Sequence, residues 1–438
     1  MRRRGLAASL LWLLAFLAAP RAPASTILSI AIDRDSPSTL FVSLAGMDVF
    51  ESLDGGATWR SSGTGLPGAD VRKIVNAGVG RWLATTGEGI YRTTDGGVSW
   101  SRSSISNVEP SVFDLAAAPS SGIVVYAATA AGGFLSLNAG VSWQPMGPGF
   151  PSTDSFPRLA VDPTNLDRVY AVSQTGFYRS IDGGRSWAKT GFQIFAFGTG
   201  GILDVAIDPN RPQAIYVSDL FCALGCATAL RRSDDGGDTS APTLGASRIP
   251  AVVVDSGSVV IAATSETLQR SFDRGATWEA IGRGIPLPVA VLASSRSSSL
   301  VVAGTRAGQL YATTDHGTTW RALTDPAPIC VAAQGQVCVA GRFRVSASFI
   351  APGEPQQIAQ PVSLTENAAA FWFFSANNLE IVVKVVDGRA FNGRFWVFLA
   401  GLSDVDYLVS VTDSVTGSTH VYANARGQLR SQADTNSF

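Results

Sequence analysis

Histidine and charged residues are scarce in this sequence. Only two histidines, His316 and His420, occur among 438 residues, and charged residues make up 15% of the chain, against ~25% in an average globular protein. Two isolated histidines leave no His-rich metal site and little scope for Ser-His-Asp or Cys-His catalysis. The 33 basic and 34 acidic residues nearly cancel and form no block of like charge, so a broad basic face for phosphate backbones is missing. We therefore expect no metal, no cofactor and no nucleic-acid partner.

Long apolar runs are also missing beyond the N-terminus, and we expect no transmembrane segment in the mature chain. The N-terminus itself has three arginines at 2–4, an apolar run over 6–19 and the small-x-small sequence Ala-Pro-Ala at 22–24. This order is typical of a secretory signal peptide, and the run is short for a membrane anchor of ~20 residues. The sequence predicts a signal peptide over 1–24 and a secreted or periplasmic mature protein, which we expect to be a monomer.

Cysteine is sparse, and its four copies fall into two local pairs. Cys222 and Cys226 enclose three residues, and Cys330 and Cys338 enclose seven. Neither spacing is that of a zinc site. Because an exported chain folds in an oxidising environment, we expect two short-range disulfides, Cys222–Cys226 and Cys330–Cys338.

An eight-residue sequence recurs through the first three quarters of the chain. Ser-Leu-Asp-Gly-Gly-Ala-Thr-Trp at 52–59 returns as Thr-Thr-Asp-Gly-Gly-Val-Ser-Trp at 93–100, and five further copies occupy 136–143, 180–187, 233–240, 271–278 and 313–320. The residues at the third position are Asp54, Asp95, Asn138, Asp182, Asp235, Asp273 and Asp315. Their intervals of 41, 43, 44, 53, 38 and 42 residues match one four-stranded propeller blade.

Each copy predicts a tight turn between two strands. The Asp or Asn at the third position can accept hydrogen bonds from N–H groups of the turn, and the fifth position is always glycine, as a site with positive φ requires. The Trp at the end of most copies offers a large apolar area to bury between neighbouring blades. Every unit runs from an innermost to an outermost strand, so no strand exchange between the first and last blades is expected, and how the ring closes is open.

The pattern Ser-x-Asp-x-Gly-x-Thr-Trp resembles the Asp-box of the bacterial neuraminidase repeat superfamily, which includes sialidases, sortilin-type receptors, xyloglucanases and photosystem II assembly factors. The resemblance covers about residues 26–326 and implies a seven-bladed β-propeller. In that superfamily the box lies at the blade periphery, away from the axial pocket. The resemblance therefore implies that the seven third-position residues are structural, and the fold alone does not fix an activity.

From about residue 327 the period ends and longer apolar runs appear. Runs that predict strands lie at 342–350, 369–375, 379–386, 395–400, 407–412 and 419–422. They favour a small β-sandwich over 327–438, a segment that resembles a C-terminal module of secreted bacterial proteins. The predicted fold class is all-β, with a seven-bladed β-propeller followed by a small β-sandwich.

No complete catalytic motif accompanies the repeat. Sialidases carry an aromatic-Arg-Ile-Pro sequence ahead of the first box, and the nearest match here, Ser-Arg-Ile-Pro at 247–250, lacks the aromatic residue and enters the sixth blade. Xyloglucanases of the superfamily act in a cleft between two propellers, whereas this chain predicts one. We assign no catalytic residue and favour a non-catalytic binding or assembly scaffold that recognises a protein or glycan partner through propeller loops. The alternative is a secreted glycoside hydrolase, sialidase-like or xyloglucanase-like.

Aromatic residues gather in the loops of the fourth and fifth blades. They are Phe150, Phe156, Phe192, Phe195, Phe197 and Phe221, close to the Cys222–Cys226 segment. A cross-linked aromatic loop face suits binding of a partner or a glycan. The alternative is that these rings pack under the long loops as a satellite core.

Overall fold

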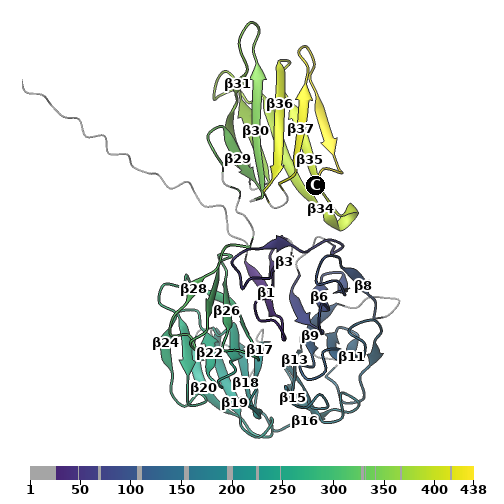
Figure 1. The fold of residues 1–438 in the computed structure, drawn as a ribbon, viewed down its shortest axis with the longest axis vertical. Coiled ribbons are helices and arrows are strands. Elements are labelled where there is room, and N and C mark those ends of the chain that lie inside the picture. Colours follow the sequence, from purple (N-terminus) through teal and green to yellow (C-terminus); the bar gives the residue numbers. More distant parts are fainter. Residues whose placement is uncertain are drawn as a thin grey trace, which may run out of the picture.

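The structure is a computed structural model built almost entirely of β-strands (Figure 1). It describes residues 26–47, 49–67, 71–105, 111–151, 157–194, 201–222, 226–246, 248–326, 330, 332–340, 342–365, 367–414 and 417–438. The four-residue α1 (Arg389–Asn392) is the one helix in this part of the chain. No helix among these residues has the length and apolar character needed to cross a membrane.

The described residues up to 322 contain seven four-stranded antiparallel sheets. The first four sheets are β1 (Ile27–Ile32), β2 (Leu40–Leu44), β3 (Val49–Ser52) and β4 (Arg60–Ser61); β5 (Lys73–Asn76), β6 (Trp82–Thr86), β7 (Gly89–Thr93) and β8 (Ser101–Ser103); β9 (Val112–Ala117), β10 (Val125–Thr129), β11 (Gly132–Ser136) and β12 (Gln144–Pro145); and β13 (Arg158–Val161), β14 (Val169–Ser173), β15 (Gly176–Ser180) and β16 (Ala188–Lys189).

The other three sheets follow the same strand order. They are β17 (Gly201–Asp208), β18 (Arg211–Cys222), β19 (Cys226–Ser233) and β20 (Ala241–Ala246); β21 (Ala251–Val254), β22 (Val260–Ala263), β23 (Leu268–Ser271) and β24 (Glu279–Ile281); and β25 (Val289–Ser294), β26 (Val301–Thr305), β27 (Leu310–Thr313) and β28 (Arg321–Ala322). Each sheet is one blade of a β-propeller, and each of the seven turns predicted from the repeat joins the third and fourth strands of its blade.

Burial explains the sequence of each blade. Every residue of β2, β10 and β14 is buried, because both faces of a blade pack against its neighbours. The fourth strands β4, β12 and β16 are only two residues long and exposed. The apolar content of the strands therefore falls from the inner part of the blade to the rim.

The ring closes by direct packing of the first blade against the last. Strand β1 contacts both β5 and β25, and Figure 1 shows β1 and β26 side by side. Thr324 joins the two blades, because its N–H donates to Gly56 O at 3.1 Å and its carbonyl accepts the Trp59 indole N–H at 2.9 Å. Both blades consist of consecutive strands, so closure involves no strand exchange.

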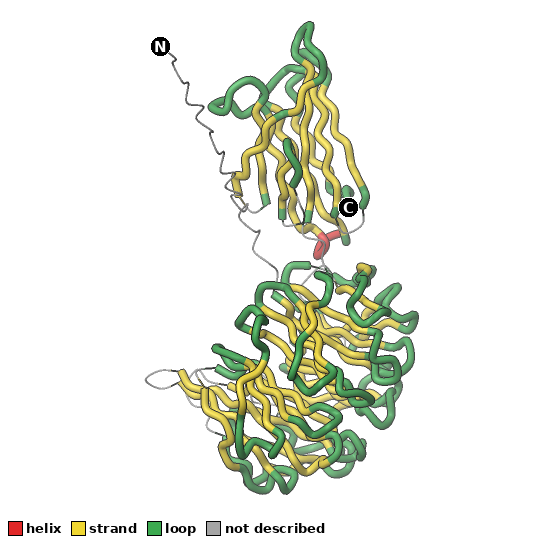
Figure 2. Tube along the Cα trace, turned by 60° about the vertical axis from the view of Figure 1, so that its left-hand side comes forward, coloured by secondary structure: helices red, strands yellow, loops and turns green. Residues whose placement is uncertain are grey.

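The C-terminal residues form two facing sheets with a common core. One sheet contains β29 (Gln336–Val339), β30 (Phe343–Ile350), β36 (Asp406–Asp413) and β37 (Thr419–Asn424), with β31 (Gln357–Ile358) paired to β30; the other contains β32 (Gln360–Thr365), β33 (Ala368–Trp372), β34 (Ile381–Gly388), β35 (Arg394–Gly401) and β38 (Ser431–Asp434). Alternate residues point inward, and Val345, Phe371 and Val409 are fully buried. The tube in Figure 2 shows strands running through both parts of the molecule. The predicted all-β class is confirmed.

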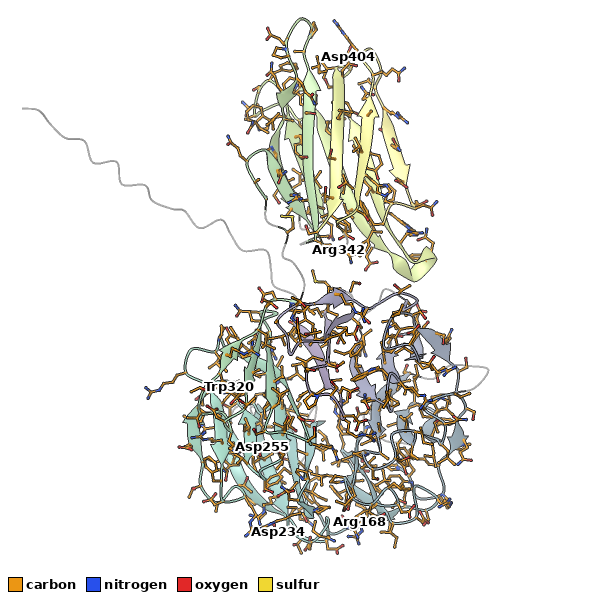
Figure 3. The ribbon with its side chains drawn as sticks, in the orientation of Figure 1. Arg168, Asp234, Asp255, Trp320, Arg342 and Asp404 are labelled. Atoms are coloured by element: carbon orange, nitrogen blue, oxygen red, sulfur yellow. A yellow bond between two sulfur atoms is a disulfide. The ribbon has the colours of Figure 1, made fainter. Side chains whose placement is uncertain are left out.

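An ion pair and a disulfide tie the first strands of the sandwich. Arg342, labelled in Figure 3, donates from Nε and Nη2 to the two carboxylate oxygens of Asp413, each at 2.7 Å, and both side chains are buried. The Cys330–Cys338 disulfide is present, with the two Cα atoms 5.7 Å apart. Its prediction from the short spacing is confirmed.

The second cysteine pair lies in the hairpin of the fifth blade. Cys222 is disulfide-bonded, and the β18–β19 register places Cys226 directly opposite it. Since the side chain of Cys226 lies outside the described part, the Cys222–Cys226 pairing stays a prediction.

Candidate functional site

The seven repeated turns share one hydrogen-bond pattern. In the first copy, the Ser52 hydroxyl donates to Asp54 Oδ1 at 2.8 Å and accepts the N–H of Gly56 at 2.8 Å. Asp54 also accepts the N–H of Thr58 at 2.8 Å and the Thr58 hydroxyl at 2.5 Å. The corresponding bonds occur in the other six copies, except that in the third copy the Asn138 amide donates to the Ser142 hydroxyl. The glycine at the fifth position has positive φ in every copy, for example 85° at Gly56.

These hydrogen bonds keep the box carboxylates ionised. The hydrogen bonds from the Ser or Thr at the seventh box position, such as Thr58 to Asp54, lower the pKa to about 2 at Asp54, Asp95, Asp182, Asp273 and Asp315. At Asp235 partial desolvation raises the pKa, but the hydroxyls of Ser233 and Thr239 outweigh it and hold the value at about 2. Each of these carboxyl groups is thus ionised and hydrogen-bonded within its own turn, and their structural role stays a prediction.

The Trp residues of the boxes connect neighbouring blades. The indole N–H of Trp100 donates to Ser62 O of the preceding blade at 2.5 Å, and that of Trp278 donates to Thr243 O at 3.1 Å. Trp100 and Trp187 are buried. The other four, Trp59, Trp143, Trp278 and Trp320 (the last labelled in Figure 3), are only half-buried, so the expected burial between blades is partial for them.

Of the six aromatic residues expected to form a loop face, the described Phe150, Phe192 and Phe221 differ widely in exposure. Phe192 is 4% exposed and stacks on Phe177 with the ring centroids 4.8 Å apart. Phe150 is half-buried and meets Trp187 edge to face at 5.2 Å. The packing of these two rings favours the alternative of a satellite core under the loops, and a binding role for them stays a prediction. Phe221 is 39% exposed, and Phe156, Phe195 and Phe197 lie outside the described residues.

Four charged side chains instead come together on the inner strands of the ring. Lys73 and Arg158 are the first residues of β5 and β13, while Asp114 and Asp204 belong to β9 and β17. Lys73 Nζ lies 3.6 Å from Asp114 Oδ1. Both cations act electrostatically on Asp204. The group therefore spans four successive blades around the axis.

The two carboxylates of this group hold neighbouring blades together. Asp114 Oδ2 accepts the backbone N–H of Leu159 in the next blade at 2.9 Å, and Asp204 Oδ2 accepts that of Val252 at 2.9 Å. In the first blade, Ser29 Oγ takes the same role toward Ile74 at 3.0 Å. The inner strands thus use a short polar side chain to satisfy a backbone donor of the following blade.

Burial and the cations have opposite effects on the Asp204 carboxyl group. Burial raises the pKa of Asp204, whereas Lys73, Arg158 and the N–H of Val252 lower it, and the net shift is upward. Protonation of Asp204 would therefore leave less negative charge facing Lys73 and Arg158.

Two arginines at opposite ends of inner strands have guanidinium donors without a hydrogen-bond partner among the described residues. Arg158 Nε is buried and has no hydrogen-bond partner among the described residues. Arg296, which follows β25, has no ion pair within 4.0 Å in the same part of the chain. Protein atoms around the Arg296 guanidinium reduce its hydration, which lowers its pKa to about 10, although the nearby negative charge of Asp162 acts to raise the pKa. Unmatched guanidinium donors in such surroundings are suited to an anionic ligand group.

The axial group was not found by sequence reasoning, although a signal exists. Asp114 and Asp204 each interrupt an apolar strand, in Phe-Asp-Leu and Leu-Asp-Val, and an acidic residue at such a position needs a partner. Arg248, from the incomplete sialidase motif, is exposed, and its carbonyl accepts the N–H of Ser265 at 3.0 Å. Among the described residues, no hydrogen bond or ion pair joins Arg248 to the axial group.

No protein-family model matches this chain, and no curated protein matches it. Solved structures do match. An ancestral GH74 enzyme is 16% identical with a TM-score of 0.56, over 92% of this chain and 63% of that one, so this chain spans less than two thirds of its length. The GH74 xyloglucanase from Xanthomonas campestris is 13% identical with a TM-score of 0.58, over 94% of this chain and 74% of that one.

The extracellular domain of a candidate one component system from B. thetaiotaomicron is also similar. It is 10% identical with a TM-score of 0.51, over 91% of this chain and 52% of that one. The structural similarity shows a shared β-propeller fold. At such low sequence identities it does not show the activity, which has to be argued from the residues of this chain.

Proposed function

We propose that this protein is a secreted, non-catalytic binding or assembly scaffold whose propeller recognises a protein or glycan partner. In this proposal residues 1–24 are a signal peptide, residues 26–326 form the propeller domain and residues 327–438 form the sandwich domain. The Cys330–Cys338 disulfide supports export to an oxidising compartment. Recognition takes place where the inner strands begin, at the mouth of the ring.

The observation that carries the proposal is the buried Arg158 Nε without a partner among the described residues. Arg158, like Lys73 two blades away, is the first residue of an inner strand, and both cations act electrostatically on Asp204. A buried donor that lacks an acceptor costs free energy, and a ligand that supplies the acceptor recovers it. The partner is therefore one that presents an anionic group, either a protein carboxylate or an acidic sugar.

The hydrolase alternative is supported by the fold shared with GH74 enzymes, and fold alone does not carry activity. A glycosidase needs two carboxyl groups on either side of one bond, about 5 to 9.5 Å apart. Here Asp114 and Asp204 each accept a backbone N–H from the next blade, which favours a structural role. We therefore expect no hydrolysis of xyloglucan or sialosides.

The test compares two acidic probes with their neutral counterparts. We expect the mature chain to bind either polyglutamate or polygalacturonate, and to bind polyglutamine and neutral xyloglucan much more weakly. Which acidic probe binds decides between a protein and a glycan partner. Arg158→Gln and Lys73→Met should each weaken binding about tenfold, as expected for loss of a charge-assisted hydrogen bond, and added salt should weaken it further.

The matched control is Arg394→Gln, which removes an exposed charge from the sandwich and should leave binding unchanged. Equal binding of acidic and neutral probes, or unaltered binding by both axial variants, would refute the proposal. Turnover of xyloglucan or a sialoside that disappears in Asp114→Asn or Asp204→Asn would establish the hydrolase instead.

A further inference from the structure

A cavity of about 190 Å³ opens on the outer face of the C-terminal sandwich. Its floor is made by the neighbouring strands β30 and β36, and its walls by β31 and by the loop Gln334–Gln336. Figure 1 shows β29, β30, β31 and β36 next to one another. The cavity belongs to the sandwich and shares no residue with the axial group of the propeller.

The floor offers free hydroxyl groups. Along β30, Val345, Ala347 and Phe349 point into the core, so Ser346 and Ser348 point outward. Ser346 lies directly opposite Ser410 of β36 in the strand register. The hydroxyls of these two paired serines have no hydrogen-bond partner among the described residues, whereas Ser348 Oγ accepts the amide of Gln356 at 2.7 Å.

One wall of the cavity is held by the disulfide. Cys330 and Cys338 enclose the loop, and within it the N–H of Gln336 donates to Ala333 O at 3.0 Å. Gly335 has a φ of 76°, and a Cβ at this position would lie 2.4 Å from Cγ2 of Ile358 in β31. A glycine is therefore required for the loop to approach β31 this closely, and the cavity is a preformed feature.

The lining specifies the kind of ligand. None of the described lining residues is ionisable, and hydroxyl and amide groups alternate with the exposed aliphatic side chains Ile358 and Leu408. A charged ligand would find no counter-ion here, whereas a sugar ring offers hydroxyls for the serines and glutamines and C–H groups for the aliphatic side chains. The volume is below the ~300–1,000 Å³ of pockets for larger ligands, so it suits one ring.

We propose that this cavity is a binding site for a single neutral sugar residue of a glycan. The two free serine hydroxyls supply the hydrogen bonds, and the disulfide-held loop positions the glutamine amides. The sandwich would then bring the whole chain to a neutral glycan, independently of the anionic partner proposed for the propeller.

The experiment uses the full mature chain and saturation-transfer NMR with the methyl glycosides of glucose, galactose, mannose and N-acetylglucosamine as probes. We expect at least one to bind with a dissociation constant on the order of 1 mM, as befits so small a ligand. The double variant Ser346→Val/Ser410→Val should weaken binding about tenfold by removing both hydroxyls. Glucuronate and glucosamine, which carry charge, should bind no better than their neutral parent sugar.

Ser431→Val is the matched control, because Ser431 is an exposed serine on β38 of the other sheet, and it should bind like the wild type. Cys330→Ser/Cys338→Ser should weaken binding by releasing the loop while the strands keep their circular dichroism. Absence of binding by all four neutral probes, or full binding by the double serine variant, would overturn the proposal. Neither result bears on the acidic probes used for the propeller.

Discussion

At the residue scale, Trp100 combines a buried ring with an indole hydrogen bond to the preceding blade. It is 5% exposed, packs edge to face against Phe41 with ring centroids 6.4 Å apart, and donates to Ser62 O. We expect Trp100→Ala to lower the free energy of unfolding by ~3–5 kcal/mol, as for a large buried side chain. Urea denaturation measures the loss, and half-buried Trp59→Ala should cost less. A loss under ~1 kcal/mol for Trp100→Ala would show that the ring is not part of the core.

The box carboxylates also predict how stability depends on pH. Their pKa values of about 2 lie below the ordinary 3.8, so the carboxylates stabilise the folded chain above pH 3.8. This contribution is lost as the pH falls from about 4 toward 2, where the folded state also becomes protonated. The melting temperature should therefore fall steeply over that interval.

Substitution of box aspartates by asparagine tests whether their carboxylates cause the acid-induced loss of stability. The third copy already contains an asparagine at this position. Asn138 accepts the N–H of Ser142 at 2.9 Å and donates to its hydroxyl at 2.8 Å, so the turn forms without a titrating group. The triple variant Asp95→Asn/Asp182→Asn/Asp273→Asn should fold. Its melting temperature should decrease less between pH 4 and pH 2 than that of the wild type. An unchanged acid profile would assign the loss to other carboxylates.

At the scale of single elements, short-range features could be predicted and long-range ones could not. The turns of the boxes were predictable because the hydrogen bonds of the first and third box residues lie within one turn, as between Ser52, Asp54 and Gly56. The Cys330–Cys338 disulfide was predictable for the same reason. The axial group depends instead on how inner strands of different blades align, such as Asp204 with Val252, 48 residues apart, and no local pattern encodes that register.

The aromatic residues of the fourth and fifth blades show a related limit. Phe192 lies in the loop after β16 and is 4% exposed, whereas Phe221 lies near the end of β18 and is 39% exposed. The sequence around these two residues does not show which ring turns toward the core. In the sandwich, where alternation is clear, six strands were predicted. The other four, β29, β31, β32 and β38, were missed because they are short or their residues alternate weakly.

At the scale of the whole molecule, the ring depends on contacts between residues almost 300 positions apart. The Thr324 hydroxyl lies 2.8 Å from Gly56 O and 2.7 Å from Ala57 O. Leu323 packs in the core shared by the first and last blades, over Gly56. The sandwich has a core of its own, formed by residues of both its sheets. Closure of the propeller and folding of the sandwich therefore draw on separate sets of residues.

This separation predicts where the chain can be cut. A fragment of residues 26–326 retains Leu323 and Thr324 and should unfold cooperatively, with a melting temperature close to that of the propeller in the full chain. A fragment of residues 26–320 loses the buried leucine and the Thr324 hydrogen bonds, which together should cost at least ~3 kcal/mol. Calorimetry and hydrogen exchange of β1 and β25 compare the two, with residues 327–438 expressed alone as the control. Equal stability of both fragments would show that these six residues do not close the ring, and an unfolded 26–326 would show that the propeller requires the sandwich.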